Sequence, residues 1–159
     1  MPGSQLAVDR YLQDHHVATL ATSAGDVAWA AAVFYVNDGH TLYFLSSPTS
    51  RHCANLARNP RVAVTIQEDH DDWRTIKGVQ LAGNACEIGG AEADRARTLY
   101  VRKFPFVEDA GGDTPAVLAQ AMRKIRWYKV VPTVLYFIDN SAGFGQRREI
   151  DLRGAGRSS

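Results

Sequence analysis

Short runs of β-branched and aromatic residues, separated by tight polar turns, recur along the chain. Runs of this length and composition are typical of β-strands. They predict strands at Val17–Thr22, Val27–Val36, Thr41–Leu45, Arg61–Gln67, Lys77–Glu87 and Arg126–Asp139, with a return segment at Phe144–Arg148. The Asp38-Gly39 step predicts a tight hairpin, and Pro132 predicts a break, an edge or a bulge in the last long strand.

Helical patterns are fewer. Apolar residues at helical spacing in Ser4–His15 predict an amphipathic helix that Ser4 caps and that lies against a sheet. Other helices are expected after Ser50, where Pro60 closes a short one, and at Ala91–Lys103 and Pro115–Lys124, with a mobile acidic loop at Glu108–Thr114. Six or seven mostly antiparallel strands with inserted helices predict a mainly β fold, a small closed or split barrel. We expect one domain over residues 1–152 and a disordered tail at 153–159.

The composition argues against several classes of binding partner and site. The chain has 159 residues, enough for one domain, and its 18 basic and 17 acidic side chains leave a net charge of +1. Such a balance attracts neither nucleic acid nor an anionic membrane surface. The two cysteines, Cys53 and Cys86, are expected to be reduced and mostly buried. No apolar stretch reaches the ~18 residues of a membrane span, and the start lacks the apolar core of a signal peptide, so we expect a cytoplasmic protein.

The stretch Leu42–Pro60 combines a buried strand, a turn of small hydroxyl residues and a helix start. The first N–H groups of a helix lack internal acceptors and lie at the positive end of its dipole, so they attract anions. Acidic residues are favoured there, yet Arg51 and His52 occupy the first turn. The pattern indicates a phosphate site. The alternative is that Thr49 or Ser50 is only an N-cap and Arg51 only a solvated side chain.

The run Lys77–Glu87 alternates between two kinds of residue. One face is apolar (Val79, Leu81, Ala85) and the other is small or polar (Gly78, Gln80, Ala82, Asn84). We expect the apolar face in the core, and the other to approach a flat ligand or a second subunit. Gln80 lies centrally on that second face, where it is either a contact residue or an ordinary exposed strand residue.

The acidic segment Glu68–Trp73 contains His70 and so raises the question of a metal site. Hairpin tips are usually polar and solvated, and no second set of ligands is spaced to complete a site, so we expect no metal. Trp73 is a large aromatic residue on an expected turn. Such a residue is often covered by a partner chain or a ligand.

Several motifs resemble a known family. LYFLSSPTSRHCANLARNPRVAVTI, preceded by WAAAVFYVNDGHT and followed by KGVQLAGNA, resembles the flavin-binding split barrel of the pyridoxamine 5'-phosphate oxidase-like family. KGVQLAGNA, VRKFPF and IDNSAGFGQRREIDL resemble more closely its YhbP-like bacterial subgroup. The resemblance covers Val17–Leu152. It implies a six- to seven-stranded antiparallel split barrel of the FMN-binding type, and a homodimer that holds two FMN molecules between its subunits.

The resemblance also implies contacts for FMN, position by position. Ser46 and Ser47 match flavin contacts, and Ser50, Arg51 and His52 match the grip on the FMN phosphate. The backbone of Ala32, Val33, Phe34 and Tyr35 matches groups that face the isoalloxazine ring, and Gln80 falls close to a flavin contact from the fifth strand.

Departures from the family pattern restrict the expected reaction. His52 stands where the oxidases have lysine, and Ala30 and Tyr35 stand where they have cations that face cofactor and substrate. A phosphorylated pyridoxine substrate would be poorly held, so true pyridoxamine 5'-phosphate oxidase activity is not expected. The pair Arg147-Arg148 either compensates in part or is simply solvated.

The expected function is therefore that of an FMN-dependent oxidoreductase acting on a small molecule, with NADH or NADPH as a candidate hydride donor. The sequence shows no Ser/His/Asp constellation, no carboxylates paired for acid–base catalysis and no phosphate-binding glycine motif. Two alternatives remain open. One is a flavin-binding or flavin-storing protein without turnover. The other is a haem-binding or haem-degrading split barrel, for which the candidate ligands are His15, His16, His40, His52 and His70.

Overall fold

The structure is a computed structural model that describes residues 2–109, 120 and 123–154. Its strands are β1 (Val17–Ala24), β2 (Val27–Phe34), β3 (Val36–Asp38), β4 (Thr41–Ser46), β5 (Arg61–Gln67), β6 (Lys77–Ile88), β7 (Arg126–Asp139) and β8 (Arg147–Glu149). The α-helices are α1 (Pro2–Asp14), α2 (Arg51–Arg58), α3 (Gly90–Lys103) and α4 (Phe106–Asp109). Short 3₁₀ turns are η1 (Trp73–Thr75), η2 (Asn140–Ala142) and η3 (Leu152–Gly154). Among the described residues, no helix is long and apolar enough to cross a membrane.

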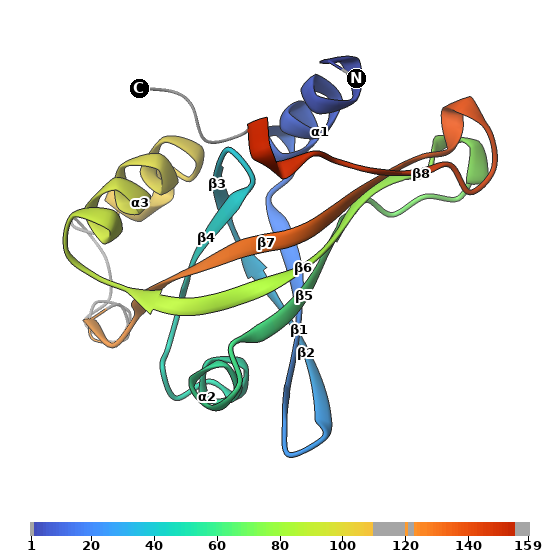
Figure 1. Cartoon of the computed structure of the whole chain (residues 1–159). Coiled ribbons are helices and arrows are strands. Elements are labelled where there is room, and N and C mark those ends of the chain that lie inside the picture. Colours follow the sequence, from blue (N-terminus) through green and yellow to red (C-terminus); the bar gives the residue numbers. More distant parts are fainter. Residues whose placement is uncertain (1, 110–119, 121–122, 155–159) are drawn as a thin grey trace.

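The eight strands form one antiparallel sheet that curls into a split barrel (Figure 1). The strand order is β2-β1-β5-β6-β7-β4-β3, with β8 added on β7. Because β2 and β3 end the order but are joined in the chain through Tyr35, the two edges of the sheet are drawn together. Figure 1 shows α2 at the end of the molecule where the β1–β2 turn lies, and α1 at the opposite end.

Two apolar cores follow from the alternation of the strands. The first fills the curled sheet, and its fully buried members include Leu12, Leu20, Phe44 and Leu135. The second lies under α3, where Tyr100 and Phe104 of the helix end are buried with Val36 and Tyr43. The amphipathic helix α1 therefore packs on the sheet as predicted, but it begins at Pro2, so the prediction that Ser4 caps it was wrong.

The long strands were predicted well. Arg61–Gln67 and Arg126–Asp139 have the predicted bounds, and the predicted core and outer faces of β6 are confirmed except at Gly78, which is buried. The expected strand Val27–Val36 is interrupted at Tyr35. Its N–H donates to the His16 carbonyl oxygen (3.0 Å) and its hydroxyl donates to the Leu12 carbonyl oxygen (2.7 Å). These contacts turn the chain from β2 into β3, so one expected strand becomes two. With the three-residue β8, the described sheet has eight strands.

Pro132 marks a bulge, which was one of the predicted alternatives. The register of β6 against β7 shifts between Ala82 and Gly83, so that Ala82 pairs with Val134 and Gly83 with Pro132. Thr133 is the extra residue, and its hydroxyl donates to the Ala82 carbonyl oxygen (3.2 Å). The bulge lets one strand of 14 residues bend around the barrel without breaking.

Three further predictions concern the segments beside or beyond the described residues. The expected loop Glu108–Thr114 begins inside α4, which covers 106–109, and its remainder lies outside the described residues. The helix expected at Pro115–Lys124 also lies largely outside them. The 3₁₀ turn η3 extends to Gly154, two residues into the expected tail, and 155–159 is not described.

The two cysteines differ in burial. Cys53 is buried as predicted, whereas Cys86 is exposed and was wrongly expected to be mostly buried.

Candidate functional site

The turn between β4 and α2 is organised by Ser50. This residue has extended backbone angles (φ −62°, ψ 150°) and its hydroxyl oxygen accepts from the Cys53 N–H (3.3 Å), which is the geometry of an N-cap. The same hydroxyl donates to the Ser47 carbonyl oxygen (2.7 Å). Ser50 thus fixes both the start of the helix and the path of the preceding turn, and a small hydroxyl residue is needed because both partners are backbone groups.

His52 is held against the turn by serine hydroxyls. Its Nε2 lies 2.6 Å from the Ser46 Oγ and 3.3 Å from the Ser50 Oγ, and these two oxygens are 3.3 Å apart. The imidazole is therefore half-buried and oriented, not free in solvent. The sequence identified all three residues, but their mutual hydrogen bonds depend on how the turn folds.

Arg51 begins α2 and is exposed, with its guanidinium carbon 4.2 Å from the centre of the Trp29 ring on β2. The first turn of α2 has no acidic residue, and none of the ion pairs among the described residues involves Arg51. Helix geometry also leaves the first N–H groups of α2 without intrahelical acceptors. A preoriented cation and open N–H groups at a helix start form an anion-binding arrangement. Sequence reasoning missed Trp29, because its contact with Arg51 is non-local.

Cys53 lies in the first turn of α2, in surroundings that favour its thiolate form. Burial raises the pKa of its thiol, but the polar side chains of His52, Ser50, Ser46 and Tyr128 around the sulfur outweigh burial and hold the pKa below its usual value. The same hydrogen-bond donors and the positive end of the helix dipole would stabilise any anion at this position. Sequence reasoning read Cys53 only as a buried thiol. The signal it overlooked is that Cys53 is the third residue after the cap.

The predicted ring-contact segment lies on the edge strand β2. Only β1 is hydrogen-bonded to β2 within the described sheet, so alternate backbone groups of β2 point away from a partner strand. Ala32 and Phe34 are exposed and Val33 is half-buried. Tyr35 differs: it is fully buried and its N–H is already bonded to His16, so it offers no free donor to a cofactor.

Gln80 is exposed on the outer surface of β6, as one of a patch of small and polar side chains. We call this patch the small-residue face; it comprises Thr19, Ala21, Ala30, Ala32, Ala63, Thr65, Gln80 and Ala82. One row across it pairs Ala32 with Thr19, Thr19 with Thr65 and Thr65 with Gln80. Three interstrand spacings separate Ala32 from Gln80 by roughly 14 Å. Within one chain, therefore, Gln80 is not brought together with the β2 segment.

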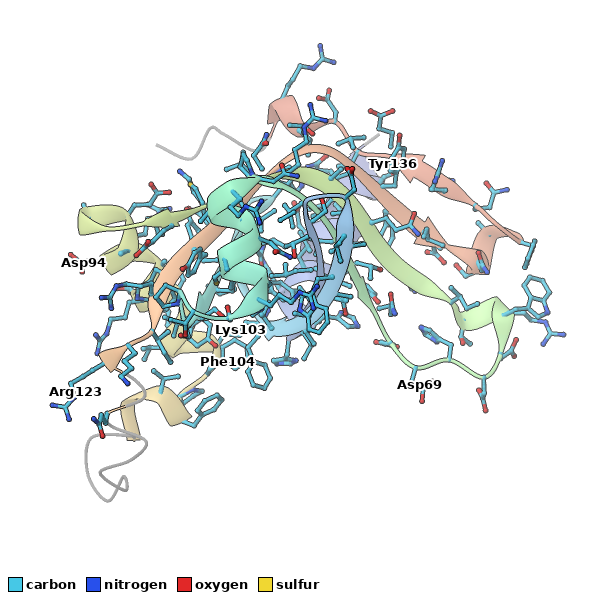
Figure 2. All side chains as sticks on the ribbon, turned by 90° about the horizontal axis from the view of Figure 1, so that it is seen from below. Asp69, Asp94, Lys103, Phe104, Arg123 and Tyr136 are labelled. Carbon is cyan, nitrogen blue, oxygen red and sulfur yellow. The ribbon has the colours of Figure 1, made fainter. Side chains whose placement is uncertain are left out.

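The remaining candidate residues of the sequence are engaged in other contacts. The guanidinium of Arg147 lies 4.4 Å from the centre of the Tyr136 ring, and Arg148 donates to the Ser4 hydroxyl (3.4 Å), both on an exposed surface. Figure 2 shows Tyr136 and Asp69 in separate regions, Asp69 on the loop between β5 and η1. In the described part of the chain, no group of three or more His, Cys, Asp or Glu is arranged to hold a metal ion.

Four of the five histidine rings make hydrogen bonds among the described residues. His15 contacts Glu68, His40 contacts Gln5 and Asp9, His52 contacts Ser46 and Ser50, and His70 contacts Thr75. The His16 ring makes none in this part of the chain. It is exposed and lies edge-on to Phe104, with a ring separation of 5.7 Å.

Comparison with known proteins gives a family match and similar curated proteins. The family model described as pyridoxamine 5'-phosphate oxidase matches residues 5–137. A UPF0306 protein of Klebsiella pneumoniae is 32% identical over 143 residues, which are 89% of this chain and 88% of that protein.

Solved structures share the fold at low sequence identity. A candidate pyridoxamine 5'-phosphate oxidase from Listeria innocua matches with a TM-score of 0.65 and 20% identity, over 86% of this chain and 98% of that one. A heme binding protein from Mycobacterium smegmatis matches with a TM-score of 0.68 and 21% identity, over 89% and 55%. ChuZ from Campylobacter jejuni matches with a TM-score of 0.74 and 16% identity, over 96% and 61%.

Proposed function

The chain belongs to the pyridoxamine 5'-phosphate oxidase family, and from that premise we propose that it binds FMN and acts as an FMN-dependent oxidoreductase on a small molecule. The observation that carries the proposal is the start of α2. There Arg51, the N-cap Ser50 and the oriented His52 surround N–H groups that have no intrahelical acceptor. A phosphate fits these donors, and it removes the conflict between two basic residues and the positive end of the helix dipole.

The residues present fit a flavin nucleotide in two further respects. The edge strand β2 starts beside the phosphate donors, since Trp29 contacts Arg51, and its unpaired backbone groups can hydrogen-bond the rim of a planar ring. The lowered pKa of the Cys53 thiol supports an environment that favours negative charge. Bound FMN supplies hydride-transfer chemistry, while the chain binds its phosphate, orients its ring and shields one side of it.

The small-residue face supports a homodimer as the functional unit. Side chains no larger than threonine, except Gln80, allow a second copy to approach the outer sheet closely. In such a dimer a ring held on β2 of one subunit would meet Gln80 of the partner subunit, which accounts for the roughly 14 Å that separates the two segments within one chain. The side chains Ala30 and Tyr35 supply no cation for a second phosphate, so the proposed substrate is not a phosphorylated pyridoxine.

A titration of the purified protein with FMN, followed by flavin fluorescence, tests the proposal. We expect Arg51→Ala to weaken binding by about 1.5–3 kcal/mol, which is the range for a hydrogen bond to a charged group. Arg58→Ala is the matched control, because Arg58 is an exposed arginine at the other end of the same helix. Equal affinities of the Arg51→Ala variant and the parent would refute the phosphate site.

The same sample then reports on turnover and assembly. Anaerobic addition of NADH or NADPH should bleach the flavin band if a reduced nicotinamide is the donor. Binding without bleaching would favour a flavin-storing protein or another donor. Light scattering of the loaded protein should give about 35 kDa, which is two chains of 17.5 kDa; a monomer would rule out the proposed cleft between subunits.

Haem binding is the second candidate, and one observation favours it. His16 is exposed, its ring has no hydrogen-bond partner among the described residues, and it lies edge-on to Phe104, which in turn packs against Phe34 and Phe106. An open imidazole beside aromatic rings is a suitable axial ligand for a porphyrin. A Soret band after addition of haemin, with no quenching of FMN, would select this function instead.

A further inference from the structure

Three phenylalanines and a histidine from separate segments of the chain meet at the end of β2. Phe34 ends β2, Phe104 follows α3, Phe106 begins α4 and His16 precedes β1. The centre of the Phe104 ring lies 5.2 Å from that of Phe34, 5.9 Å from that of Phe106 and 5.7 Å from that of His16. These are the spacings of aromatic rings in contact. We call these four residues the aromatic patch.

Two phenylalanine rings of the aromatic patch are accessible. Phe104 is buried, but Phe34 is 48% exposed and Phe106 is 56% exposed, and their ring centres are 6.2 Å apart. Single exposed apolar side chains are ordinary on a protein surface. Two half-exposed rings that contact each other and share a buried third ring instead form a continuous aromatic surface, on which another planar ring can stack.

Lys103 brings a positive charge to the edge of the aromatic patch. Its Nζ lies 4.1 Å from the centre of the Tyr35 ring and 5.9 Å from that of Phe104, and Figure 2 shows Lys103 and Phe104 close together. The Nζ donates one hydrogen bond, to the Leu12 carbonyl oxygen (3.2 Å). An ammonium group has three hydrogens to donate. Within the described residues, this group therefore has donors left for a ligand.

The charge of Lys103 also lacks a paired carboxylate. None of the ion pairs among the described residues involves Lys103. Burial lowers the pKa of Lys103 to about 8, and the charge of Asp14, an exposed residue that forms no ion pair with it, offsets this only in part. A partly buried ammonium group is stabilised by an anionic oxygen that reaches it. The aromatic patch thus has a stacking surface and an adjacent cation without a counter-ion.

The aromatic patch lies at the end of the strand that is proposed to hold the flavin ring. Trp29, which contacts Arg51, marks the phosphate end of β2, and Phe34 is five residues further along. Five residues of extended strand span roughly 17 Å. Phe34 shares the outer face of β2 with Ala32, because strand residues two apart point to the same side. A ring held along this part of β2 therefore has the aromatic patch beside it.

We propose that the aromatic patch and Lys103 form the substrate subsite, and that the substrate is a planar aromatic compound with an anionic oxygen such as a carboxylate. Its ring stacks on Phe34 and Phe106, and its oxygen accepts from the Lys103 ammonium group. The role as a substrate subsite rests on the proposed FMN site. Binding of the aromatic acid itself needs only the residues named here.

Titration of the full chain with naphthoate, followed by the proton resonances of this ligand, tests the subsite. Naphthoate has a planar ring and one carboxylate, and it reacts with neither thiols nor flavins. We expect it to bind with nuclear Overhauser contacts to the rings of Phe34 and Phe106. Naphthylmethanol, its neutral analogue, should bind about ten-fold more weakly because it cannot form a hydrogen bond between two charged groups. The absence of naphthoate binding would overturn the proposal.

Two variants assign the contacts. Phe106→Ala should weaken naphthoate binding about five-fold, which corresponds to the loss of one aromatic contact. Phe144→Ala is its control, because Phe144 is 78% exposed and lies outside the aromatic patch. Lys103→Met should bind naphthoate no better than naphthylmethanol, whereas the exposed control Lys77→Met should keep the preference for the carboxylate. Unchanged affinity in Phe106→Ala, or a preference for the carboxylate that survives in Lys103→Met, would overturn the proposal.

The same titration with FMN present separates this subsite from the proposed function. Naphthoate should bind at least as tightly when FMN is saturating, because the two ligands occupy neighbouring positions. Competition between them would overturn the placement beside the flavin ring. Arg51→Ala should bind naphthoate like the parent, since Arg51 lies at the phosphate end of β2. A parent that binds FMN but not naphthoate would refute the subsite alone, and one that binds naphthoate but not FMN would refute the proposed function alone.

Discussion

Replacing Gly83 with alanine tests whether the bulge between β6 and β7 shapes the barrel. A Cβ atom at this position would lie 2.1 Å from the Val131 carbonyl oxygen and 2.8 Å from the Pro132 Cα. Both are backbone atoms of a strand that β6 pairs along its full length, so they cannot rotate away as a side chain would. Relief requires the bulge to open by about 1 Å. We expect a loss of about 3 kcal/mol or more, the upper end of the range for overpacking.

Urea denaturation followed by circular dichroism measures this loss. With a slope of about 2 kcal/mol per molar urea, a loss of 3 kcal/mol lowers the midpoint by about 1.5 M. Gly3→Ala is the control, because among the described residues no atom outside its chain neighbours and its own helix backbone lies within 4 Å of the added Cβ, and because alanine is favoured in a helix. A loss below about 1 kcal/mol for Gly83→Ala would show that the strands yield easily, and the argument from close backbone contact would fail.

Two further predictions concern single side chains. Ser50→Ala should destabilise the fold by about 1 kcal/mol because it removes the N-cap of α2; thermal denaturation measures this loss, and the exposed neighbour Thr49→Ala should stay within about 0.5 kcal/mol of the parent. Burial lowers the pKa of Lys103 to about 8. Between pH 8 and about 9.5 the unfolded chain therefore binds more protons than the folded chain, and the stability of the parent should increase as the pH rises. Denaturation at several pH values should show this gain in the parent but not in Lys103→Met; an equal gain in both would assign it to other groups.

Local patterns were sufficient for the elements that carry the candidate site. Alternation predicted two strands, Arg61–Gln67 and Lys77–Glu87, and the structure has both with almost the same bounds. The sequence from Ser46 to Arg51 predicted the start of a capped helix, which is also present. Period-two alternation and a cap depend on residues within a few positions of one another, so they can be read from the chain directly. The same local motifs carried the resemblance to the pyridoxamine 5'-phosphate oxidase-like family, which the comparisons confirm.

Long-range contacts could not be read in this way. Nothing near Arg51 in the chain indicates that Trp29 lies under its guanidinium, and nothing near His15 indicates that its ring contacts Glu68, 53 positions later. The interruption at Tyr35 has the same origin, because burial of its ring and its bond to Leu12 override the strand propensity of Val27–Val36.

The sequence alone thus determined most of the strands and helices that the structure describes, the capped start of α2 with its two basic residues, and the family. The tertiary structure decided which side chains meet: it closed the sheet at Tyr35, oriented His52 with Ser46, and joined His15 to Glu68. The physical reason is the range of the interactions. Propensity and capping act along the chain, whereas hydrogen bonds between distant side chains form only after packing has brought their elements together.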